Sequence, residues 1–150
     1  MTAPDATTPG TRQRTRHRAR QAAVQMLYQC EVGQLDIEEV VRTFWSANLP
    51  GSEGAPEAVR TFAEQLARLT TANRAKIDPL IVETAEHWRL SRMAALDRII
   101  LRLAIGEFLD GSTPRNVVIN EALELAKTFS GEESVKFVNG ILDAVKKKMP

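Results

Sequence analysis

The chain has 150 residues, of which 43% are hydrophobic, and it carries a formal net charge of +1. A chain of this size can bury one compact core or two small adjoining ones. Its single cysteine, Cys30, excludes an internal disulfide and is typical of the reducing cytosol. No segment reaches the ~20 apolar residues that cross a bilayer. We therefore expect a cytoplasmic protein without a membrane anchor, and the abundance of Ala, Leu, Arg and Glu favours an all-α fold.

The positive charge is concentrated near the N-terminus. Residues 11–20 contain no acidic residue, and every second position is an arginine: Arg12, Arg14, Arg16, Arg18 and Arg20. A cationic end on a nearly neutral chain indicates an anionic partner, and RNA is the leading candidate. The basic end lacks the apolar segment of a secretory signal, which leaves a mitochondrial transit peptide as the targeting alternative.

The first part of the chain is expected to form an arm and two helices. Residues 1–14 are interpreted as a disordered basic arm, and residues 15–150 as one helical domain. The periodicity predicts a first helix from about Arg16 to Gly33 and a short second helix capped by Asp36. The loop at residues 48–55, rich in Pro, Gly and Ser, is the best candidate for an internal boundary.

Five more helices are expected in the rest of the chain, which makes about seven helices and no strand. Their starts are indicated by Pro56, by Asp78 as a cap before Pro79, by Ser91 as a cap, by Pro114, and by a capping box that begins at Ser130. The fifth is apolar nearly all round and ends at Gly111. Such a helix belongs in the middle of a bundle.

Tyr28 is the aromatic residue of greatest interest in the first helix. On a helical wheel it lies about 140° from the centre of the apolar stripe. His17, Arg18, Gln21 and Gln25 share this outer face. An exposed aromatic ring among cationic and amide side chains can stack on an unpaired base, worth roughly 1–3 kcal/mol per base. In the alternative interpretation, Tyr28 packs against a neighbouring helix and the arginines only solubilise the arm.

Other candidate residues have less certain positions on their helices. Arg16 and Arg20 extrapolate toward the apolar side of the wheel, so either the helix begins later or these side chains reach around it. Phe137 lies about 100° from the centre of the apolar stripe of the last helix, next to Lys136. Phe137 is either an ordinary packing residue or a second stacking residue.

Catalytic patterns are missing from the sequence. The two histidines, His17 and His87, have no recognisable nucleophile spacing to Cys30. No phosphate-binding glycine loop and no metal-ligand cluster is found. We therefore expect no enzyme activity, no cofactor and no metal.

Three stretches of the chain resemble the NusB family of bacterial transcription antitermination factors. They read RHRARQAAVQMLY at residues 16–28, LDRIILRLA at residues 96–104, and VINEALELAK followed by KFVNGILD between residues 118 and 143. The resemblance spans about residues 14–146. Gln21 stands where the family often has Glu, and Arg12 and Arg14 extend the basic segment beyond its usual length.

The resemblance implies two three-helix bundles with an additional helix. It also implies binding of boxA, a single-stranded RNA element, together with NusE, which is also a small-subunit ribosomal protein. The pair would act in the RNA polymerase antitermination complex and support rRNA transcription. Asp97 becomes a candidate contact for NusE. The implied RNA contacts are Arg16, Arg18, Arg20, Tyr28, Lys136 and Phe137.

Two alternatives belong to other functional classes. A similar helical domain stands at the front of certain ribosomal-RNA cytosine methyltransferases, but the cofactor glycine loop of those enzymes is not found here. The chain could also be a helical dimer whose basic arm is incidental. The sequence decides neither the oligomeric state nor the preferred RNA sequence.

Overall fold

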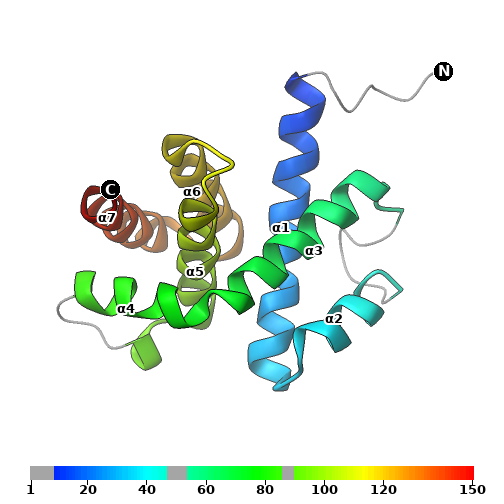
Figure 1. Ribbon diagram of the computed structural model, residues 1–150, viewed down its shortest axis with the longest axis horizontal. Helices are drawn as coiled ribbons and strands as arrows, with labels where there is room; N and C mark the ends of the chain where they lie inside the picture. Colours follow the sequence, from blue (N-terminus) through cyan, green and yellow to red (C-terminus); the bar gives the residue numbers. More distant parts are fainter. Residues whose placement is uncertain (1–8, 47–53, 86–89) are drawn as a thin grey trace. The chain divides into compact units, whose positions relative to one another are not determined.

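The structure is a computed structural model that describes residues 9–46, 54–85 and 90–150 (Figure 1). These residues form seven α-helices and one 3₁₀ turn, and no strand occurs among them, which confirms the all-α prediction. The helices are α1 (Pro9–Gly33), α2 (Ile37–Phe44), α3 (Glu57–Ala72), α4 (Arg74–Thr84), α5 (Ala95–Asp110), α6 (Arg115–Phe129) and α7 (Glu132–Lys148), with the 3₁₀ turn η1 at Leu90–Arg92.

The chain divides into two compact units, residues 1–68 and residues 69–150. The first holds α1, α2 and most of α3, and the second holds the end of α3 and the helices α4 to α7. The composition predicted an internal boundary at residues 48–55, but the division falls inside α3. Most of residues 48–55 lie outside the described residues.

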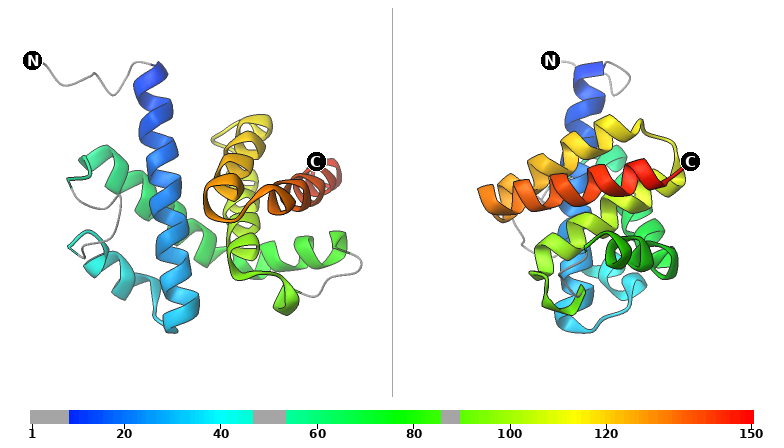
Figure 2. Two further views of the ribbon diagram at one scale, coloured as in Figure 1. Left: turned by 180° about the vertical axis from the view of Figure 1, so that it is seen from behind. Right: turned by 90° about the vertical axis from the view of Figure 1, so that its left-hand side faces the viewer.

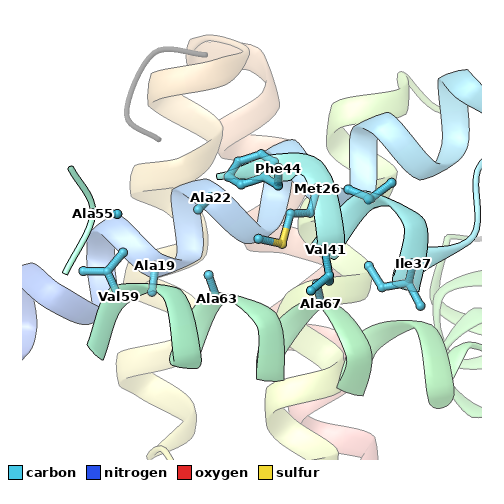
Figure 3. Close-up of a cluster of buried hydrophobic side chains, with 11 residues drawn as sticks. Ala19, Ala22, Met26, Ile37, Val41, Phe44, Ala55, Val59, Ala63 and Ala67 are labelled. Atoms are coloured by element: carbon cyan, nitrogen blue, oxygen red, sulfur yellow. The ribbon is translucent and has the colours of Figure 1, made fainter. Parts of the chain in front are cut away.

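The core of the first unit lies where its three helices meet (Figure 3). From α1 and α3 the contributions are mostly alanines. Phe44, 1% exposed, is the largest side chain in the cluster and comes from α2. The buried members are Ala19, Ala22, Met26, Ile37, Val40, Val41, Phe44, Ala55, Val59, Ala63 and Ala67.

The second unit is built around α5, and every residue from Ile99 to Phe108 is buried. This confirms the prediction of a central helix. In Figure 2, α6 and α7 (yellow to red) pack against α5 and against each other, and α4 also contacts α5 and α7. Arg102 is a buried cation of α5, and it donates to the carboxylate of Asp78 on α4.

Two helices begin earlier than the sequence indicated. α1 begins at Pro9, so residues 9–14 are helical and do not belong to an arm; residues 1–8 lie outside the described part of the chain. α4 begins at Arg74, because the carbonyl of Asn73 already accepts the N–H groups of Lys76 and Ile77. Asp78 and Pro79 therefore lie inside α4 and do not start it.

Two expected caps are also wrong. Ser91 lies in the 3₁₀ turn before α5, where Arg98 donates to the carbonyls of Leu90 and Met93. Ser130 ends α6 through its own N–H, and Gly131 occupies the N-cap position of α7 without a side-chain cap. The expected end of α5 is confirmed, because Gly111 has the left-handed φ of 76°.

Candidate nucleic-acid interface

Tyr28 belongs to an outer face of α1. Tyr28 is 41% exposed, so it presents surface to a ligand. The Nε2 atoms of His17 and Gln21 lie 3.3 Å apart, which confirms that these two side chains share a face. With a rise of 1.5 Å per residue, the outer face extends over about 16 Å from His17 to Tyr28.

Arg16 and Arg20 lie on a different face of α1, turned toward α3. The guanidinium carbon of Arg16 is 4.8 Å from the centroid of the Phe62 ring, and that of Arg20 is 5.5 Å from it. Both distances are typical of cation–π contacts. Because α1 is already helical from Pro9, the position of these arginines no longer depends on where the helix begins.

The burial of Arg20 does not fit the expected direct contact with RNA. It is 3% exposed, so it presents almost no surface to a ligand. The cause is its place one turn after Arg16, where α3 covers it with Phe62. Arg16 is half-buried, and Arg12 and Arg14 are exposed. The accessible cations on α1 therefore lie toward its N-terminal end.

Phe62 is a residue of the candidate site that the sequence did not reveal as such. Along α3 it lies three and four positions from the apolar residues Val59 and Leu66, a spacing typical of a core-facing stripe, and its ring packs against the core cluster. The other part of its surface lies beside a groove of about 500 Å³ between α1 and α3. The residues that line the groove are Arg12, Thr15, Arg16, Glu57, Ala58, Thr61, Phe62 and Gln65.

The second unit brings two candidate residues to one place. Asp97 and Phe137 both line a hollow of about 230 Å³ at the start of α5 and α7, together with Glu133. The Oδ1 atom of Asp97 is buried and has no hydrogen-bond partner among the described residues. Lys136 is exposed next to Phe137, which is half-buried. A buried carboxylate oxygen of this kind is suited to an N–H donor from a partner.

Metal and membrane sites are not evident in the part of the chain that the structure describes. No group of three or more His, Cys, Asp or Glu side chains there could hold a metal ion. None of the described helices combines the length and the apolar character that a membrane span requires.

The fold and the charged helix define the class of the protein. It is an all-helical protein whose N-terminal helix presents arginines, amide side chains and an exposed tyrosine, as nucleic-acid-binding proteins do.

Comparison with known proteins identifies the family. The model of the NusB family matches residues 17–147. The transcription antitermination protein NusB of Koribacter versatilis (strain Ellin345) is 45% identical over 136 residues, which cover 90% of each chain. The solved structure of T. maritima NusB is 33% identical, with a TM-score of 0.78, and covers 99% of this chain and 94% of that chain. The chain belongs to the NusB family.

A further solved structure is relevant to the candidate site. It contains the antitermination factors NusB and NusE in complex with double-stranded RNA, and one of its chains is 26% identical to this one with a TM-score of 0.73. The match covers 91% of this chain and 98% of that chain. The NusB family consists of RNA-binding antitermination factors and not of enzymes, in agreement with the expectation from sequence.

Proposed function

We propose that this protein is a transcription antitermination factor that binds boxA single-stranded RNA together with NusE and so supports rRNA transcription. The observation that carries the proposal is the outer face of α1, where Tyr28 is exposed on a helix rich in arginine. Membership of the NusB family supports it. The RNA and its transcription complex are made in the cytoplasm, and we place the protein there.

The arginines would supply most of the affinity by neutralising phosphates and releasing counterions. Arg16 and Arg18 are the contacts proposed from the family resemblance, and Arg12 and Arg14 add exposed charge. Tyr28 would stack on a base. With about four to six phosphates contacted, log K should fall with log salt at a slope of roughly −3 to −4.

The second unit would contribute both to RNA and to NusE. Phe137 and Lys136 are the proposed RNA contacts at the start of α7. Asp97 is the proposed contact for NusE, because its buried Oδ1 is suited to a donor from another protein. The NusB and NusE proteins of the related structure are in complex with RNA, which supports such a pairing. The assembly with RNA polymerase is part of the same proposal.

Sedimentation of the full chain with purified NusE, with and without boxA RNA, tests the proposal. We expect a one-to-one complex with NusE that takes up the RNA, and we expect Asp97→Asn to weaken the protein pair. Asp110→Asn, an exposed carboxyl at the other end of α5, is the matched control. Failure of the unaltered chain to join NusE and boxA RNA would contradict the proposed function.

A further inference from the structure

We propose that the groove between α1 and α3 is a nucleotide subsite, in which an RNA base stacks on Arg16 while Phe62 holds the guanidinium from behind. The inference rests on the proposed function and adds to it a second contact region and a positioning residue, Phe62.

The first argument is the geometry of Arg16. Its guanidinium carbon lies 4.8 Å from the Phe62 centroid, inside the ~6 Å limit of a cation–π contact. The half-buried side chain packs against the Phe62 ring and also lines the groove. Arginine planes of this kind are platforms on which unpaired RNA bases stack.

The second argument is the charge gathered on one ring. Arg20 contacts the same Phe62 ring at 5.5 Å, so two cations share one aromatic side chain. Arg12 and Arg16 both line the groove, and Glu57 is the acidic residue of its lining. Phosphate is the complementary group for the two guanidiniums.

The third argument is the chemistry of the groove walls. Thr15, Thr61 and Gln65 supply hydroxyl and amide groups, which can both donate to and accept from the edge of a base. A volume of about 500 Å³ lies in the usual range for small-molecule sites. A cationic wall, a stacking plane and polar edge groups together fit one nucleotide of a single strand.

This subsite is separate from the Tyr28 face. From Arg16 to Tyr28 is twelve residues, which corresponds to about 18 Å along the helix and about 120° around it. One base therefore cannot contact both side chains. The RNA strand would pass around α1 and meet a stacking group at each of two places.

The test compares Arg16→Lys with the wild-type chain. Lysine keeps the charge but lacks the planar face, so we expect the affinity for single-stranded RNA to fall at least fivefold with the salt slope largely kept. In RNAs that carry 2-aminopurine at successive positions, stacking quenches the fluorescence of that base. One position that the wild type quenches should regain its fluorescence with Arg16→Lys. Arg42→Lys, an exposed arginine at the end of α2, is the matched control and should change neither readout.

Phe62 variants test its positioning role. Phe62→Tyr keeps an aromatic face and should bind within twofold of wild type. Phe62→Leu removes the aromatic ring, so the RNA position that loses its quenching in Arg16→Lys should lose it here too. Thermal unfolding checks that the variant is folded. Unchanged affinity and quenching in Arg16→Lys would overturn the subsite.

The two proposals fail in different ways. If the wild type binds boxA and scrambled RNA equally, the proposed boxA function fails, and the quenching at Arg16 can still be scored on either RNA. If boxA is preferred but Arg16→Lys and Phe62→Leu keep full quenching, only the subsite is wrong.

Discussion

Asp78 and Arg102 join α4 to α5 by a two-point ion pair. Nε of Arg102 donates to Oδ1 at 2.8 Å, and Nη2 donates to Oδ2 at 3.2 Å. The side chain of Arg102 is 8% exposed and that of Asp78 is 25% exposed. A planar guanidinium that faces a carboxylate in this way gains strength from both hydrogen bonds, and its geometry fixes how the two helices pack.

Removing the carboxylate should be costly. Asp78→Asn removes the carboxylate that pairs with the buried Arg102, and we expect a loss of about 3 kcal/mol, at the low end for a buried pair because Asp78 is partly exposed. Urea denaturation measures the change. Asp143→Asn breaks the exposed pair of Lys147 and Asp143, whose side chains are 76% and 54% exposed, and should cost less than about 1 kcal/mol. Equal losses in both variants would contradict this assignment.

Substitution by alanine should change the stability of the protein in opposite directions at two glycines. Gly111 has a φ of 76°, where a Cβ is strained, so Gly111→Ala should destabilise the protein by about 1–2 kcal/mol. Gly140 lies inside α7 and is exposed, and a Cβ added there would meet no neighbouring atom within 4 Å. Gly140→Ala should therefore stabilise by up to about 1 kcal/mol. Thermal unfolding of both variants checks the pair, and a stabilised Gly111→Ala would be the contrary result.

Tyr28→Ala should weaken RNA binding without unfolding the protein. Because Tyr28 is 41% exposed, little core packing is lost, while a base stack worth about 1–3 kcal/mol disappears. The salt slope should be largely kept, since no phosphate contact changes. Val32→Ala, one turn further along α1 and 61% exposed, is the control. Normal affinity of Tyr28→Ala would refute the stacking role.

Cys30 should react slowly with alkylating reagents. Burial raises the pKa of its thiol, and the nearby carboxylate of Asp36 raises the pKa further. Because the thiolate is the reactive form, iodoacetamide should react at neutral pH more slowly with the folded chain than with the unfolded one, and the rate should rise at higher pH. Asp36→Asn should shift the pH profile of the alkylation rate to lower pH, because it removes the charge of Asp36. The shift should be only part of the total, since burial is the larger cause of the raised pKa. A folded profile that coincides with the unfolded one would disprove the raised pKa.

The helices were predictable because their signals are local. Apolar periodicity together with cap and proline signals located the seven helices of the described residues, and the continuous apolar character of α5 correctly predicted its central position. The start of α4 was missed because Asp78 looks like a cap in sequence, whereas its partner Arg102 lies 24 residues away. Local rules contain no information on such a distant pair.

The candidate site was predictable only in part, for a similar reason. The exposure of Tyr28 follows from the helical wheel, because it depends on α1 alone. The burial of Arg20 and the contact of Arg16 with Phe62 depend on how α3 packs against α1. An aromatic residue in an apolar stripe looks like core in sequence whether or not part of its ring faces a groove, so Phe62 could not be recognised.

The most direct test of the account is a fluorescence-anisotropy titration of boxA RNA against a scrambled RNA of equal length, at two salt concentrations and with or without NusE. We expect boxA to bind several-fold tighter, NusE to widen the difference, and both affinities to fall with salt. Equal binding of the two RNAs that vanishes at higher salt would show that α1 is only a charged surface, and it would contradict the proposed function.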